Sequence, residues 1–251
     1  LIFFFYGLKL SPQKLKAGLK NWKLHLLVQA STFLIFPLIV LTFYPLMQNE
    51  EQETLWLAFF FLAALPSTVS SSVVMVSMAK GNIPAAIFNA SISGIIGIVL
   101  TPIWMGLFVQ NTQTDFDFTE IYTKLLLQIL LPVFLGLLLQ RFLGVLAQKY
   151  SSQLSLFDKS IILLIIYKSF AESFEAKIFG SVSLLDLVML FIGVLALFFL
   201  VFFSTGITAK KLKFNLEDQI TAQFCGTKKS LVHGTVFSKI LFGKMASIGI
   251  I

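Results

Sequence analysis

Two polar segments interrupt an otherwise apolar sequence, and both carry groups suited to binding ions or small solutes. In the first, Pro66 is followed by five hydroxyl side chains within six residues: Ser67, Thr68, Ser70, Ser71 and Ser72. Proline removes a backbone donor and clashes with the preceding turn, so we expect a helix break near residues 64–67. At membrane depth, irregular backbone is tolerated only where protein buries it or water wets it. The alternative is a kink whose hydroxyls bond back to the preceding turn, but five hydroxyls behind one proline favour a binding site.

The second polar segment, residues 221–234, places charges where the chain is expected to cross a membrane. It contains Gln223, Gly226, Thr227 and two adjacent lysines, Lys228 and Lys229. Gly226 is expected to break the helix, as Pro66 does in the first segment. Charged residues inside a membrane span are costly, usually face an aqueous cavity and are candidates for function. In the alternative, a short helix ends at the interface and both lysines snorkel outward.

The apolar span near 83–109 adds a stripe of small and polar residues. Asn89, Ser93 and Gly97 are spaced at i, i+4 and i+8, so they share one face of a helix, and Ser91 lies close by in the sequence. Such a stripe is as typical of a helix-packing seam as of a ligand-binding wall. The amide oxygen of Asn89 can coordinate a cation.

Catalytic and metal chemistry have little support in this sequence. Only His25 and His233 offer an imidazole, neither has a carboxylate nearby to form a catalytic pair, and Cys225 is the only cysteine. A membrane-embedded enzyme is therefore the weakest function class, and zinc modules and disulfide scaffolds are excluded. No cofactor is expected beyond a coupling ion.

The composition requires that membrane helices position these segments. Of 251 residues, 57% are hydrophobic and 12% are charged, and the mean hydropathy is +0.89. A water-soluble fold is excluded because lipid must cover most of such a surface. The apolar runs do not alternate as barrel strands do, so an all-α polytopic membrane protein is predicted. With about 20 apolar residues per crossing, the predicted spans are a helix tail at 1–8, crossings near 24–46, 55–79, 83–109, 121–141, 158–176, 184–209 and 217–238, and the start of another near 240.

The loops between these spans alternate in charge. Basic residues lie before residue 24, after residue 79, and in the ranges 141–159 and 210–213. Acidic residues lie after residues 49, 114 and 171. Because basic loops are retained in the cytoplasm, the net charge of +7 indicates topology rather than a nucleic-acid partner. The expected partners are the lipid bilayer and a small solute.

The two polar segments also resemble each other. Each has a break and a Ser/Thr or Lys cluster followed by an apolar helix, and an odd number of predicted crossings separates them. The second copy then runs through the membrane in the opposite direction, which is the inverted-repeat plan of secondary transporters. Both ends of the sequence lie in apolar runs, so we expect a fragment truncated at both ends.

Four stretches of the sequence carry a family resemblance: residues 6–38, LPSTVSSSVVMVSMAKGN at 65–82, IPAAIFNASISGIIGIVLTP at 83–102 and FCGTKKSLVHG at 224–234. They closely resemble the bacterial bile acid:sodium symporter family, in its SBF-like branch. The resemblance implies one transmembrane transporter domain of ten helices in the bacterial plasma membrane. Its two inverted five-helix repeats, here 1–110 and 120–251 and both incomplete, form a panel and a core domain, and two broken helices cross in the core.

The resemblance further implies where a coupling ion binds. Carried over by motif, the sodium ligands of relatives fall on or close to Ser71, Ser72, Asn89 and Ser91, so sodium at Ser71, Ser72 and Asn89 is one expectation. The acid and the amide that relatives carry in the ninth helix fall instead on Phe224 and Lys228. An ammonium would repel sodium by about 4 kcal/mol at a separation of about 4 Å and an effective dielectric of about 20.

Our hypothesis is that Lys228, or Lys229, occupies the space that sodium fills in relatives. The protein would then be sodium-independent or coupled to a proton. A fixed positive charge favours an anionic substrate, so the predicted function is a secondary active transporter of an organic anion. A non-transporting membrane regulator of another transport process is the alternative, because the acidic sodium ligand is missing.

Overall fold

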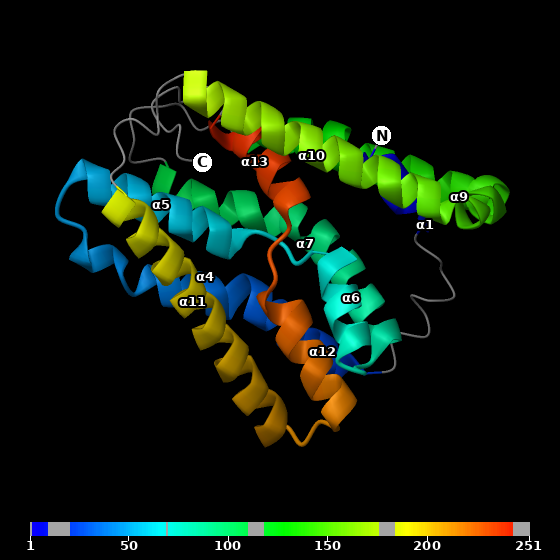
Figure 1. Ribbon diagram of the computed structural model, residues 1–251, viewed down its shortest axis with the longest axis horizontal. Helices are drawn as coiled ribbons and strands as arrows, with labels where there is room; N and C mark the ends of the chain where they lie inside the picture. The colour runs from blue at the N-terminus through cyan, green and yellow to red at the C-terminus, as the bar shows by residue number, and fades with distance from the viewer. Residues whose placement is uncertain (1, 10–20, 69, 110–117, 176–183, 243–251) are drawn as a thin grey trace.

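The computed structural model describes residues 2–9, 21–68, 70–109, 118–175 and 184–242, and most of them are helical (Figure 1). The elements in chain order are α1 (Ile2–Lys9), α3 (Trp22–Ala30), η1 (Ser31–Ile35), α4 (Phe36–Leu41), η2 (Tyr44–Leu46), α5 (Glu50–Ala64), α6 (Ser70–Met78), α7 (Ile83–Val109), α8 (Phe118–Leu125), η3 (Leu126–Leu130), α9 (Leu131–Lys149), α10 (Ser151–Glu175), α11 (Leu184–Lys211), α12 (Leu216–Thr227) and α13 (Leu231–Phe242). Within the described ranges there is no β-strand, and the predicted all-α class is confirmed.

Four helical stretches in the described part of the chain are long and apolar enough to span a bilayer. They are Trp22–Leu46, Ile83–Phe108, Thr119–Lys149 and Val188–Lys211. These stretches correspond to the crossings predicted near 24–46, 83–109, 121–141 and 184–209, and they identify a membrane protein. The crossing predicted at 158–176 lies in α10, which is not among the four, because charged residues such as Lys159 and Lys168 interrupt its apolar run.

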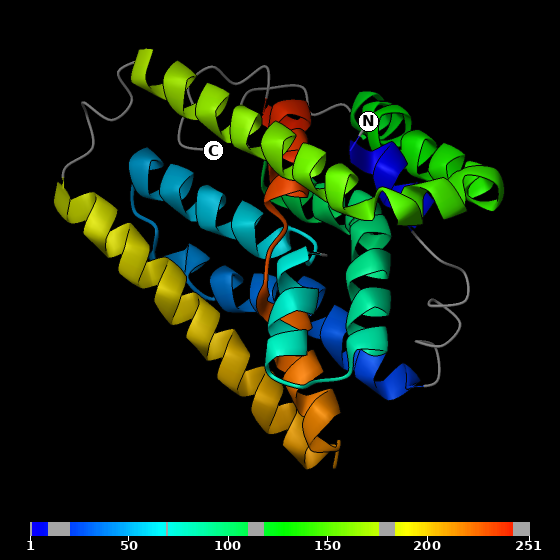
Figure 2. The same cartoon turned by 45° about the vertical axis from the view of Figure 1, so that its right-hand side comes forward.

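The two remaining predicted crossings are each divided into two short helices. Residues 55–79 form most of α5 together with α6, and residues 217–238 form most of α12 together with α13. In both views of the ribbon, the extended linker between α12 and α13 runs past the C-terminal end of α5 (Figures 1 and 2). The two breaks, far apart in the chain, therefore lie side by side, as the bridge between Ser67 and Lys229 also requires.

Two further helices widen into a π-type turn just before a proline. Turn η1 precedes Pro37 and turn η3 precedes Pro132, each with one residue between turn and proline. In η1, the Phe36 N–H bonds to the Ser31 carbonyl, five residues back. A wider turn accommodates the proline ring, which otherwise clashes with the carbonyl four residues earlier. The crossing predicted near 24–46 therefore stays helical, with a change of hydrogen-bond register near its centre.

Two buried apolar clusters hold the helices around the breaks. One joins α5, α7, α8 and α13 and includes Phe60, Met105 and Phe237, all fully buried. The other joins α3, α6, α7 and α12 and includes Leu24 and Cys225. The end of α5 belongs to the first cluster and the end of α12 to the second. The breaks therefore lie where the two clusters meet.

Close backbone approach joins α1 to α9. Gly7 packs on the Val133 carbonyl and Gly136 on the Phe4 carbonyl, with no room for a side chain at either glycine. Small residues at a membrane-helix interface let backbones come this close, so that dispersion contacts hold α1 in place.

A buried carboxylate joins the N-terminal ends of three helices. Asn21, Asn82 and Asn215 each cap a helix, α3, α7 and α12 respectively, through a side-chain oxygen. Asp218, only 5% exposed, accepts hydrogen bonds from the amides of Asn21 (2.6 Å) and Asn82 (2.8 Å). Helix N-termini carry partial positive charge, which stabilises the carboxylate between them.

Replacing Asp218 tests this junction. Asp218→Ala removes the acceptor of two hydrogen bonds to a charged group and should lower the free energy of unfolding by about 3 kcal/mol. Thermal unfolding of the purified protein in detergent measures the loss. The matched control is Glu217→Ala at the exposed neighbouring position. Equal melting temperatures for the two variants would contradict a stabilising role for the junction.

Candidate functional site at the crossing of two broken helices

Backbone hydrogen bonds hold the two breaks together. Helix α5 ends at Ala64, Leu65 is extended, and α6 starts at Ser70. The second break, at Lys228–Ser230, pairs with the first as an antiparallel bridge between Ser67 and Lys229. The Ser230 N–H donates to the Pro66 carbonyl at 2.8 Å. The crossing is therefore a short piece of β-structure between four half-helices.

The break in the second crossing does not lie at Gly226, as its sequence predicted. Helix α12 continues to Thr227, and the chain first becomes extended at Lys228. Gly226 instead lets α12 approach the helix that carries Ser31, because an added Cβ would come within 3.0 Å of the Ser31 Cβ. Gly226 therefore serves helix packing. Helix α12 ends where the extended segment after it forms hydrogen bonds with the first break.

Every carbonyl at the end of α5, from Leu62 to Pro66, accepts a hydrogen bond. The donors, in order, are the Leu65 N–H, the Lys229 ammonium, the Thr101 hydroxyl, the Lys229 ammonium again and the Ser230 N–H. Only the first of these donors lies in the same break. The carbonyls that Pro66 leaves without helical partners are thus satisfied mainly by the second polar segment.

The first polar segment in turn donates hydrogen bonds to carbonyls at the end of α12. The Ser67 hydroxyl donates to the Cys225 carbonyl at 2.7 Å, and the Ser72 hydroxyl donates to the Phe224 carbonyl at 3.4 Å. The Thr227 hydroxyl bonds back to the Gln223 carbonyl at 2.6 Å. Each broken helix therefore caps the other.

The two adjacent lysines have different environments. The Lys229 ammonium donates to the carbonyls of Thr32 (2.8 Å), Ala63 (2.6 Å) and Leu65 (2.9 Å) and lies 4.3 Å from the centre of the Phe36 ring. An ammonium has three protons, so its donors are saturated. The Lys228 ammonium lies 6.0 Å from the Phe198 ring and has no hydrogen-bond partner among the described residues. Lys228 is the positive charge at the crossing that remains available.

The stripe on α7 packs against the first break. The Ser67 N–H donates to the Ser93 hydroxyl at 2.9 Å, and Gly97 lies so close to Pro66 that an added Cβ would be 2.8 Å from its ring. Asn89, fully buried, receives a hydrogen bond from the Gln29 amide at 3.2 Å. The stripe is a packing seam along this part of the structure.

The predicted ion ligands are only partly brought together. Ser72 lies at the crossing, whereas Ser71 is exposed and Ser91 bonds back to the Ile87 carbonyl. The amide of Gln223 donates to the Phe202 carbonyl on α11 at 3.3 Å. The side chain of Ser70 lies outside the described part of the structure. In that part there is also no group of three or more His, Cys, Asp or Glu residues that could hold a metal ion.

Several residues of the crossing were missed from the sequence. Thr32 and Phe36, which surround the Lys229 ammonium, lie in an apolar span that carries no local signal of a break except Pro37. The sequence did not distinguish Thr101, whose hydroxyl donates to the Ala64 carbonyl, from the many other hydroxyl residues. Gln29, whose buried side-chain oxygen has no hydrogen-bond partner in the described structure, was also missed.

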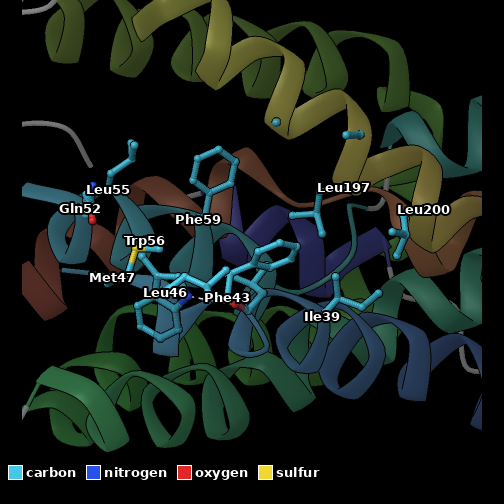
Figure 3. Close-up of a pocket in the computed structure, with 13 residues that line it drawn as sticks. Ile39, Phe43, Leu46, Met47, Gln52, Leu55, Trp56, Phe59, Leu197 and Leu200 are labelled. Carbon is cyan, nitrogen blue, oxygen red and sulfur yellow. Dashed lines mark hydrogen bonds between the residues drawn. The ribbon is translucent and has the colours of Figure 1, made fainter.

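Two cavities lie beside the broken helix α5. One of about 300 Å³ lies between α5 and α13 and has Lys229 and Ser230 in its wall. A larger one, of about 500 Å³, lies between α4, η2 and α5 on one side and α11 on the other. Figure 3 shows Phe59, from α5, and Leu197, from α11, among the side chains that line this larger cavity. Among the described residues that line it, Gln52 is the only polar one, so the cavity suits an apolar ligand or part of one.

Comparison with known proteins gives a consistent result along the whole chain. The model of the SBF-like CPA transporter family (DUF4137) matches residues 1–251. The chain is 37% identical to "Uncharacterized protein PA2026" of Pseudomonas aeruginosa over 98% of its length and 74% of the relative. It is 36% identical to "Putative symporter YfeH" of Escherichia coli, over 96% of the chain and 73% of the relative. It is 30% identical to "Sodium/bile acid cotransporter 7" of Danio rerio, over 96% of the chain and 72% of the relative.

The two lysines should differ in their effect on stability. Lys229→Met leaves three carbonyls without a donor and should lower the free energy of unfolding by about 3 kcal/mol. Lys228→Met breaks no hydrogen bond seen in the structure and should stay within about 0.5 kcal/mol of the parent protein. Thermal unfolding of both variants in the same detergent makes the comparison. A larger loss for Lys228→Met than for Lys229→Met would contradict the assignment of the saturated ammonium.

Proposed function

Because this chain belongs to the SBF-like CPA transporter family, we propose that it is a secondary carrier that moves an organic anion across the membrane by alternating access. The family is one of transporters, not of enzymes. The predicted resemblance to bile acid:sodium symporters is confirmed by the match over the whole chain. The substrate class, the coupling ion and the transport cycle are the proposed parts.

The proposal of an anionic substrate rests on the charge of Lys228. Lys228 lies in the second break, and its ammonium is next to the aromatic ring of Phe198 on α11, without a hydrogen-bond partner among the described residues. Helices α6 and α13 both begin at this crossing. The N-terminal ends of helices carry partial positive charge and favour an anion. Three sources of positive potential therefore act on the same region.

The apolar cavity supports a substrate with a large apolar body. Leu197 lines this cavity, and the next residue in α11 is Phe198, the ring beside Lys228. A volume of about 500 Å³ falls within the range typical of small-molecule pockets. The substrate we propose is an amphipathic organic anion that places its apolar part in the cavity and its charge near Lys228.

The reciprocal capping of the two breaks supports an inverted-repeat carrier. Each polar segment supplies the hydroxyls or ammonium that satisfy the end of the other broken helix. Two related units of opposite orientation, 1–110 and 120–251, produce such reciprocity naturally. Movement of one group of helices around the crossing would then expose the site to each side in turn. The plasma membrane is the proposed location, which the bacterial relatives support.

Sodium is not the coupling ion that we propose. Lys229 brings a positive charge into the crossing, and in the part of the chain that the structure describes its hydrogen bonds go to carbonyls and to no carboxylate. A sodium ion at Ser71, Ser72 and Asn89 would lack an acidic ligand and would have a lysine for a neighbour. A proton is the alternative coupling ion that we propose.

Neutralising Lys228 should weaken anion uptake. A hydrogen bond to a charged group contributes about 1.5–3 kcal/mol, so Lys228→Gln should raise the apparent KM by about tenfold or more, and Lys228→Arg should preserve most of the affinity. Uptake of a bile acid and of a steroid sulfate into proteoliposomes measures both. Lys210→Gln, at an exposed position on α11, is the matched control. Uptake of no anion by the parent protein would instead favour the membrane regulator.

Replacing sodium by N-methyl-D-glucamine should leave the initial rate of uptake unchanged. The reason is that the structure supplies its own cation at the crossing. The same proteoliposomes, with and without an inward proton gradient, distinguish uncoupled from proton-coupled uptake. Strict sodium dependence in both the parent protein and Lys228→Gln would rule out this account of coupling.

A further inference from the structure

The ammonium of Lys229 occupies a shell of oxygen acceptors drawn from two different helices. Thr32 lies in the widened turn η1, whereas Ala63 and Leu65 lie at the end of α5. The residue that fills the shell comes from a third place, the break between α12 and α13. The three N–O distances, between 2.6 and 2.9 Å, are those of strong charge-assisted hydrogen bonds.

The oxygens of this shell are available for reasons independent of Lys229. In η1 the Phe36 N–H bonds to the Ser31 carbonyl, and the next residue, Pro37, has no N–H, so the Thr32 carbonyl lacks a helical donor. In α5, Pro66 ends the helix and leaves the carbonyls of the last turn without helical donors. Two prolines thus expose the oxygens, and the helices that carry them hold those oxygens in place.

The chemistry of the shell selects a single positive charge. All three ligands are neutral carbonyls, and no acidic side chain among the described residues bonds to Lys229. Two of the carbonyls lie at the partially negative C-terminal end of α5. The face of the Phe36 ring, 4.3 Å from the ammonium, adds a cation–π contact. Divalent cations usually require carboxylates, whereas rings of carbonyls can replace the hydration shell of a monovalent cation.

We propose that this shell is a monovalent-cation site that the chain fills with its own side chain. Removal of the Lys229 ammonium opens the site to a free monovalent cation, either an alkali-metal ion or a small primary ammonium. The site is distinct from the sodium position expected at Ser71, Ser72 and Asn89, none of which contributes an oxygen to it. The inference goes beyond the proposed carrier function and does not depend on which anion, if any, is moved.

Chemical rescue of Lys229→Ala tests the site directly. The variant lacks the three methylenes and the nitrogen beyond Cβ, and propylammonium supplies the same atoms. Thermal unfolding of the full-length protein in detergent is measured at constant ionic strength in the chlorides of sodium, potassium, propylammonium and N-methyl-D-glucamine, the last being too large for the site. At least one of the three small cations should raise the melting temperature saturably, by about 3 °C or more, above the value in N-methyl-D-glucamine.

Four controls separate cation binding from general effects of salt. The parent protein and Lys228→Ala should have the same melting temperature in all four salts, because their shell is already filled. Lys229→Met should not respond either, since its side chain fills the space without a charge. Neutral 1-propanol at the same concentration as propylammonium should not stabilise Lys229→Ala.

Several results would overturn the proposed site. One is a Lys229→Ala variant that melts at the same temperature in all four salts, or that 1-propanol stabilises as much as the best cation does. Another is a parent protein that responds to the cations as strongly as the variant. If Lys229→Ala cannot be purified in N-methyl-D-glucamine, recovery of monodisperse protein in any small cation supports the site, and recovery in none of them overturns it. Because no transport is measured, failure of the carrier proposal leaves this result intact.

Discussion

Backbone carbonyls without helical partners, in the interior of a membrane protein, are the constraint on which the rest of this structure depends. Pro66 ends α5, the η1–Pro37 combination exposes the Thr32 carbonyl, and Lys228 begins the extended segment after α12. In lipid each unsatisfied peptide group costs several kcal/mol, so such breaks persist only where other parts of the protein supply donors. The donors here come from across the crossing, which forces the two broken helices together.

This constraint gives two neighbouring lysines separate roles. Lys229 has a structural role, because the three protons of its ammonium donate hydrogen bonds to carbonyls from two helices. Lys228 lies one residue away, points to a different aromatic ring, and keeps its charge available. Since alternate residues of an extended segment project to opposite sides, one short segment can serve both packing and binding. A cation that stabilises the crossing and a second cation, which we propose to meet the solute, thus come from adjacent positions.

Much of the fold could be predicted, and the failures have physical causes. Long charge-free runs indicated four of the spanning helices, and Pro66 indicated the first break because its ring is incompatible with the helix whatever surrounds it. Gly226 suggested the second break wrongly, since glycine lowers helix stability but does not prevent a helix, and close packing on Ser31 keeps it helical. The widened turn η1 was missed because a π-type turn changes only the hydrogen-bond register and leaves the hydropathy pattern intact.

By itself, the sequence determined the membrane environment, the number of polar interruptions and the presence of two lysines among apolar residues, because lipid excludes charge and proline excludes regular helix regardless of tertiary contacts. Only the tertiary structure decided which lysine is saturated, that Ser67 and Ser72 cap α12, and that Thr101 caps α5. Lys229 and Thr32 are 197 residues apart, and no local pattern encodes a hydrogen bond over that separation. Such a contact exists only once folding has brought the exposed carbonyls and the ammonium to the same place.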